Sequence, residues 1–189
     1  MVLNDDLADK SDLELVNLTL LDQENFLYLM NRYEKKLLRF IQRISGLNHD
    51  DAQDLLQEVF IKVYQNLNDF DKSLKFSSWL YRITRNQVIS NYRKNKSRPQ
   101  TSLFDFDLES CEQLVSDFDI NQNLDQALLR EKMAKILAKL DSKYREVVIL
   151  KYLEDRSYEE ISDIIKKPVS TVGTLLRRGK IELQKEFRQ

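Results

Sequence analysis

The chain is poor in the two residues that most often interrupt helices. Only 3 glycines and 2 prolines occur among 189 residues, whereas 42% of the residues are hydrophobic. Turn-rich sheet proteins use far more glycine and proline, so this composition predicts long helices and an all-α fold. The length allows one domain or two small domains.

Cysteine and histidine are nearly missing, which excludes several kinds of site. Cys111 is the single cysteine and His49 the single histidine. No intrachain disulfide can form, and a zinc site of the usual Cys/His type lacks ligands. His49 stands in the turn-like LNHDD without a nucleophile motif, so we expect no catalytic centre, no metal and no other cofactor. A redox role for Cys111 stays open.

Long apolar runs are also absent. No run approaches the roughly 18 apolar residues that cross a membrane. The N-terminal stretch MVLNDDLADKSDLELV is acidic and lacks the basic-then-apolar order of a signal peptide. We therefore expect a cytoplasmic protein with no membrane insertion.

The net charge of −1 hides a segregation of charge along the chain. Residues 75–98 hold seven bases and no acid, and residues 166–188 hold seven bases and two acids. By contrast, residues 1–24 hold seven acids and one base, and residues 99–125 hold seven acids and no base. Two basic patches separated by an acidic segment predict two contacts with polyanions.

Apolar residues at helical spacing divide the chain into two domains. They predict one helix over residues 25–45, a second from about residue 50, and a third from near Phe76 to about Asn95. These helices can bury a shared core, which predicts a helical bundle over residues 10–96. The pattern fails in residues 97–124, an extended acidic linker, and resumes in a second domain over residues 125–187.

The segment SYEEISDIIKKPVSTVGTLLRRGK, residues 157–180, predicts two short helices joined by a tight turn. Ser157 and Glu160 form a capping box, Pro168 suits the turn, and Ser170 or Thr171 can cap the second helix. The second helix ends in cations: Arg177, Arg178 and Lys180. This is the layout of a helix-turn-helix, whose second helix enters the DNA major groove. An ordinary helical hairpin with a solvated basic end is the alternative.

Two further helix faces carry candidate binding residues. If Phe76 and Trp79 face the core, then a second face of their helix gathers cations and an amide: Arg82, Arg85, Asn86 and Arg93, with Tyr92 beside them. Cations interleaved with amides and aromatics suit distorted or single-stranded DNA, because exposed bases need a π-face or a hydrogen-bonding edge.

On the preceding helix, Asp54, Gln57 and Glu58 share an exposed face. No histidine or second carboxylate pair joins them, so a docking face for a protein fits better than catalysis.

Taken in order, these segments resemble a bacterial extracytoplasmic-function sigma factor, group IV of the sigma-70 family. The segments are DAQDLLQEVFIKVYQNL, FSSWLYRITRNQVISNYRK, a linker, LDSKYREVVILKYLEDRSYEEISDII and PVSTVGTLLRRGKIEL. The resemblance implies that the first domain, region 2, docks on the clamp helices of the largest catalytic subunit of core RNA polymerase and opens the promoter −10 element. It implies that the second domain, region 4, reads the −35 element and contacts the polymerase flap. It also implies a linker that threads toward the polymerase cleft, and an inhibitory anti-sigma factor.

The resemblance assigns residues to each contact. Core polymerase binding falls to Asp54, Gln57 and Glu58. Contact with the −10 element falls to Asn68, Asp69 and Lys75, in a loop that captures a flipped base, and to Arg82, Arg85, Asn86, Asn91, Tyr92 and Arg93. Contact with the −35 element falls to Ser170, Thr171, Thr174, Arg177, Arg178 and Lys180.

Two residues depart from the family pattern in the second domain. Gly173 and Leu175 stand where a lysine and an arginine are common, so Arg177 and Arg178 are expected to carry more of the phosphate contact. The −35 sequence therefore stays open.

Two alternatives to a sigma factor remain: a DNA-binding regulator that acts without polymerase, and a helical enzyme. The docking face and the acidic linker favour a sigma factor, and the scarcity of histidine, cysteine and glycine-rich loops argues against an enzyme.

Overall fold

The computed structural model describes residues 7, 9–94 and 126–188, and among these residues helices dominate and no strand occurs. The all-α prediction is confirmed. The predicted linker and Cys111 lie outside the described residues. The chain separates into two compact units, the first holding α2, most of α3, α4 and α5, and the second holding α7 to α10.

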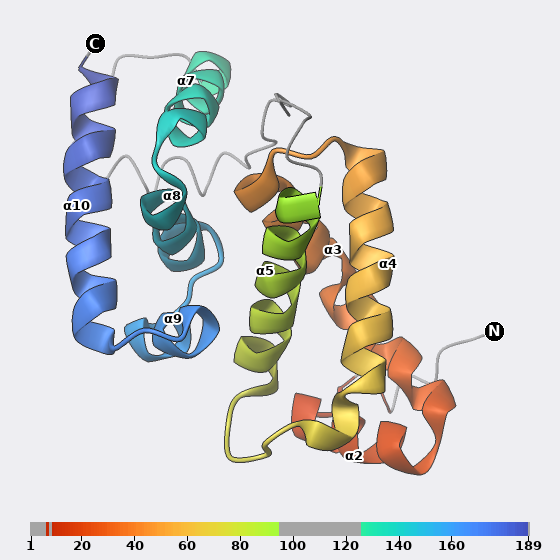
Figure 1. The fold of residues 1–189 in the computed structure, drawn as a ribbon. Coiled ribbons are helices and arrows are strands. Elements are labelled where there is room, and N and C mark those ends of the chain that lie inside the picture. The colour runs from red at the N-terminus through yellow and green to blue at the C-terminus, as the bar shows by residue number, and fades with distance from the viewer. Residues whose placement is uncertain (1–6, 8, 95–125, 189) are drawn as a thin grey trace. The chain divides into compact units, whose positions relative to one another are not determined.

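The first unit is a helical bundle (Figure 1). Its elements are α2 (Asp12–Leu21), the short 3-10 helix η1 (Gln23–Asn25), α3 (Phe26–Ser45), α4 (His49–Gln65), the 3-10 helix η2 (Leu67–Asp69) and α5 (Phe76–Lys94). The three helices predicted from apolar spacing are present with nearly the predicted ends. Their apolar stripes meet in one core, where the rings of Phe40 and Tyr81 lie 4.8 Å apart. Leu29 is buried in this core, whereas Met30, four residues after the buried Phe26, is half-buried.

Helix α2 was not predicted. A capping box starts it, because the Ser11 hydroxyl accepts from the Glu14 backbone N–H at 3.3 Å and the Glu14 carboxylate accepts from the Ser11 N–H at 2.8 Å. The helix contacts η2 and α5, so it lies across the end of the bundle where α4 ends and α5 begins (Figure 1).

The second unit contains the predicted helix-turn-helix. Its elements are α7 (Gln126–Lys139), α8 (Ser142–Val148), a π-helical turn η3 (Ile149–Leu153), α9 (Tyr158–Ile165) and α10 (Val169–Phe187). Helix α10 packs mainly on α8 and α9, and it buries Val172, Leu176, Gly179 and Leu183. Leu175, just before Leu176, is only half-buried.

Of the two helix caps predicted for the helix-turn-helix, the structure confirms one and contradicts the other. The capping box of Ser157 and Glu160 is present at the start of α9. The predicted cap of α10 by Ser170 or Thr171 is wrong, because the helix begins at Val169 and Pro168 holds the cap position. The Pro168 carbonyl accepts from the Thr171 and Val172 N–H groups at 2.8 and 3.1 Å, so both candidate caps lie inside the first turn.

Candidate nucleic-acid and protein interfaces

Helix α5 presents a cationic face away from the bundle core. Because residues 4, 7 and 11 positions apart lie on one side of a helix, Arg82, Asn86 and Arg93 share this face, with Arg85 at its edge. Asn86 and Arg93 are exposed, and Tyr92 near the helix end is 68% exposed. Asn91 follows Arg82 by nine residues, which places it half a turn around α5, away from the cationic face.

A hollow of about 300 Å³ opens beside this face. Its lining combines an aromatic ring with amides and charges: Lys62, Asn66, Asp69, Trp79, Arg82, Ile83, Asn86, Gln87 and Ser90. Gln87 lies at its base, where its Oε1 accepts from the Lys62 ammonium and its Nε2 donates to Glu58 Oε2 at 2.5 Å. The hollow thus offers hydrogen-bonding edges, one of the two things an unstacked base requires, together with the small accessible part of Trp79, which is 7% exposed. The sequence did not indicate Lys62, Asn66, Gln87 or Ser90 as site residues.

The segment between η2 and α5 follows Asp69, the residue of η2 that lines the hollow. Asn68 and Asp69 are exposed in η2, and Lys75 is exposed just before α5. The segment is anchored at both ends by the buried rings of Phe70 and Phe76, whose centroids lie 5.5 Å apart. At its tip, the Ser73 backbone N–H donates to the Asp71 carboxylate at 2.9 Å, and this hydrogen bond lowers the pKa of Asp71 below its usual value.

Helix α4 presents a different kind of face. Asp54 and Gln57 are exposed on it, as predicted from their spacing. Glu58 is also exposed, but its carboxylate accepts a hydrogen bond from Gln87 on α5. Ile61 lies seven residues after Asp54, and therefore on the same face, with 57% of its surface exposed. We did not expect Ile61 in this face, although its spacing from Asp54 was visible in the sequence.

Helix α10 carries the third face. Ser170, Thr174 and Arg177 are exposed and spaced by four and three residues, so they form one row, and Arg178 is exposed beside it. The Thr174 hydroxyl donates to the Ser170 carbonyl at 3.0 Å. Thr171 and Lys180 are half-buried and lie toward the two edges of the row. The structure thus brings three of the six predicted residues into one exposed row, with Arg178 exposed beside it, and leaves two half-buried at its margins.

The part of the chain that the structure describes contains neither a cluster of metal ligands nor a membrane-spanning helix. In this part of the chain, no group of three or more histidine, cysteine, aspartate or glutamate side chains could hold a metal ion. Nor does it contain a helix that is both long enough and apolar enough to cross a membrane.

Two helical units with cationic faces, one of them a helix-turn-helix, define a DNA-binding transcription protein. Comparison with models of known protein families identifies which kind of DNA-binding transcription protein this is. The model for sigma-70 region 2 matches residues 29–98, and the model for sigma-70 region 4 matches residues 130–183. The chain therefore belongs to the sigma-70 family, in its extracytoplasmic-function branch. It is an alternative sigma factor, which binds core RNA polymerase and promoter DNA.

Curated relatives support the same placement. The chain is 36% identical to the ECF RNA polymerase sigma factor SigW of Bacillus subtilis over 174 residues. The aligned stretch covers 88% of this chain and 91% of SigW. It is 31% identical to the ECF RNA polymerase sigma-E factor of Escherichia coli K12, with 84% of each chain covered. Sigma factors of this kind are transcription regulators rather than enzymes.

Solved structures share the fold. CnrH, in complex with the cytosolic domain of CnrY, matches with a TM-score of 0.67 and 24% identity, covering 93% of this chain and 96% of that one. The sigma factor RpoE from Bartonella quintana, in complex with the anti-sigma factor NepR, matches with a TM-score of 0.67 and 22% identity, covering 87% and 98%. At these identities the likeness establishes the fold of two helical regions.

Proposed function

We propose that this sigma factor uses α4 to hold core polymerase and α5 to hold the −10 element. The observation that carries this proposal is the difference between two surfaces of one unit. Helix α4 exposes a carboxylate, an amide and an apolar side chain at Asp54, Gln57 and Ile61, whereas α5 carries cations at Arg82, which is half-buried, and at Arg93, which is exposed. Cations attract phosphates and the α4 face does not, so one unit can bind protein and DNA at the same time.

The hollow beside α5 is the proposed site for a flipped base of the non-template strand. Extruding a base from the duplex costs a few kcal/mol, which a ring face and hydrogen-bonding edges can offset. Trp79 supplies the ring, and Asn86 and Asp69 supply edges. Within residues 68–75, Asp69 lines the site. Arg85, Tyr92 and Arg93 extend the contact along the strand. Asn91 is expected to contribute least, because it lies around the helix from this face.

The second unit is proposed to read the −35 element through α10. Ser170, Thr174 and Arg177 form the row that enters the major groove, and Arg178 contacts a flanking phosphate. Thr171 and Lys180 contact the edges of the same groove. The functional domains are residues 10–96 for region 2 and residues 125–187 for region 4, joined by residues 97–124.

Regulation and location complete the proposal. Two structures with the same fold hold an inhibitor or a partner domain, NepR on RpoE and CnrY on CnrH, and on this ground we expect an anti-sigma factor for this chain as well. We place the protein in the cytoplasm, where RNA polymerase works, and assign it no enzymatic activity of its own.

Run-off transcription tests the proposal. Purified chain and bare core polymerase are mixed with a library of genomic fragments, and transcripts that depend on the added chain should share two sequence elements upstream of their starts. If the chain fails to bind core polymerase or to start any transcript, the sigma role is wrong. DNA binding without polymerase binding would favour the alternative of an independent regulator.

A further inference from the structure

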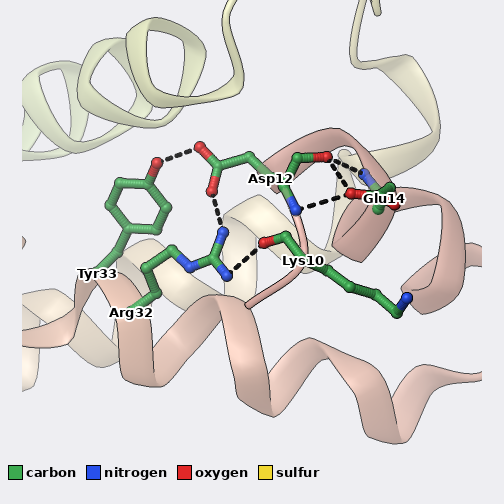
Figure 2. Close-up of polar contacts among 6 residues, drawn as sticks. Lys10, Asp12, Glu14, Arg32 and Tyr33 are labelled. Atoms are coloured by element: carbon green, nitrogen blue, oxygen red, sulfur yellow. Dashed lines mark hydrogen bonds and ion pairs between the residues drawn. The ribbon is translucent and has the colours of Figure 1, made fainter. Parts of the chain in front are cut away.

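Helix α2 lies outside the span that the region 2 model matches, which begins at residue 29. Its first residue, Asp12, nevertheless makes the densest set of polar contacts in this end of the bundle (Figure 2). Asp12 Oδ1 accepts from Arg32 Nη1 at 2.8 Å, and Asp12 Oδ2 accepts from the Tyr33 hydroxyl. Arg32 Nη2 also donates to the Lys10 carbonyl at 2.6 Å. One carboxylate therefore fixes both an arginine and a tyrosine of α3.

The tyrosine leads from this cluster to the segment beside the proposed base site. Tyr33 is buried, and its ring meets that of Phe76 edge-on, with centroids 5.9 Å apart. Phe76 in turn contacts Phe70 at 5.5 Å and Trp79 at 5.7 Å. Phe70 and Phe76 are the two anchors of residues 71–75, and Trp79 lines the hollow. A continuous path of contacts thus joins Asp12 to both the segment and the base site.

A second, independent contact links α2 to the same segment. Lys72 Nζ donates to Asn17 Oδ1, on α2, at 2.6 Å. A hollow of about 260 Å³ separates the two elsewhere, and its lining comes from both sides: Ser11, Asp12 and Leu13 from α2, and Phe70, Lys72, Leu74, Lys75, Phe76 and Ser77 from the segment and the start of α5. Residues 71–75 therefore lie against α2, and they connect Asp69, which lines the base site, to the start of α5.

We infer that Asp12 is a positioning residue for promoter opening, and that α2 is the brace which holds residues 71–75 in the conformation that receives the flipped base. The inference rests on the proposed function of that segment. A segment fixed before binding loses less conformational entropy when the base arrives, so the open promoter is more stable. Asp12 acts through Tyr33 and touches no DNA itself.

Holoenzyme carrying Tyr33→Phe or Asp12→Asn tests the inference. Tyr33→Phe removes only the hydroxyl and keeps the ring against Phe76, so the bundle stays packed. Opening is followed by the fluorescence of 2-aminopurine placed at the captured position of the non-template strand, which reports the flipped base directly. Each variant should open the promoter about three- to tenfold more slowly, in line with the loss of one buried hydrogen bond. Binding to core polymerase and to the −35 duplex should change less than twofold.

A double variant and a matched control decide between positioning and folding. The double variant Asp12→Asn with Tyr33→Phe should open the promoter no more slowly than the slower single variant. Both substitutions disrupt the same contact between Asp12 and Tyr33, so their effects should not add. Glu14→Gln removes a charge at the same end of α2 but keeps the capping box, because a glutamine oxygen can accept the same hydrogen bond, and it should leave opening unchanged. Equal slowing by Glu14→Gln, or normal opening by Tyr33→Phe, would overturn the inference. A wild-type holoenzyme that opens no promoter would overturn the proposed function together with it.

Discussion

Two glycines of α10 have different surroundings, and the difference decides what an added methyl group would do. A Cβ on Gly173 would meet only Tyr158 Cε2, at an ordinary contact distance of 3.7 Å. A Cβ on Gly179 would lie 3.0 Å from Val148 Cγ2 and 3.5 Å from Tyr144 Cβ, both on α8. Gly179 is therefore required for the close approach of α8 and α10, whereas Gly173 is not required by packing.

Alanine should stabilise the second unit at Gly173 and should not stabilise it at Gly179. Gly173→Ala should raise the free energy of unfolding of the second unit by about 1 kcal/mol, because alanine is the better helix former. Gly179→Ala gains the same preference but overpacks a buried contact, which costs about 1–3 kcal/mol, so it should lower the stability or leave it unchanged. Hydrogen exchange of the α10 amides measures both. Equal stabilisation by the two substitutions would show that α8 and α10 are not tightly packed.

At the scale of elements, the sequence predicted helices where the apolar pattern was clean and missed one where it was not. Both α2 and α9 begin with the same capping box, Ser11 with Glu14 and Ser157 with Glu160. After Ser157, three isoleucines mark one face, and the helix was predicted. After Ser11, the apolar residues of DLELVNLTLL surround the helix, and several of them, such as Leu13 and Leu21, are exposed. No stripe marks α2, so only its cap could have revealed it.

The binding sites followed the same division. Faces set by helical spacing, such as Asp54 with Gln57 or Arg82 with Asn86, could be predicted because each lies within one helix. The hollow beside α5 could not, because Lys62 and Gln87 are 25 residues apart and meet only when α4 packs on α5. For the same reason the hydrogen bond between Asp12 and Tyr33 could not be predicted, because these residues are 21 positions apart and lie on different helices.

The turn between α9 and α10 contains a residue in an unfavourable conformation. Lys166 ends α9 with φ of 54° and ψ of 51°, in the left-handed region that glycine tolerates best. Lys166→Gly should therefore stabilise the second unit by about 0.5–1 kcal/mol, measured by hydrogen exchange of the α9 amides. Asp155, with φ of 48°, is the matched comparison. Asp155→Gly should stabilise less, because aspartate adopts this conformation more readily than lysine. A larger gain at Asp155 would contradict this account of Lys166.

The exposed face of α4 should depend on its apolar residue as well as on its polar ones. Ile61→Ser should weaken binding to core polymerase about tenfold, because burying an isoleucine contributes roughly 1.5–3 kcal/mol. Ile181, on α10, is 50% exposed and serves as the control. Ile181→Ser should leave the affinity for core polymerase unchanged in the same titration. An equal loss in the two variants would show that Ile61 has no special part in docking.

On the scale of the whole molecule, the proposed function divides the work on one promoter between the two units. In this proposal the second unit reads intact duplex, whereas the first holds a strand that has been unpaired. The free energy needed to unpair the DNA therefore has to be offset by the contacts of the first unit alone. Defects in the two units should respond differently to a template that is already melted at the −10 element, and differently to salt.

Arg85→Ala and Arg177→Ala separate these contributions in the holoenzyme. Arg85→Ala should reduce transcription from duplex templates, and pre-melted templates should restore most of it, because the unpairing cost no longer has to be met by α5. Arg177→Ala should stay defective on both templates. It should also lower the salt slope of −35 binding by about 0.9, the loss of one phosphate contact, whereas Arg85→Ala should leave that slope unchanged. If pre-melting rescues both variants equally, the units do not act separately. If it rescues neither, α5 does not act on the unpaired strand.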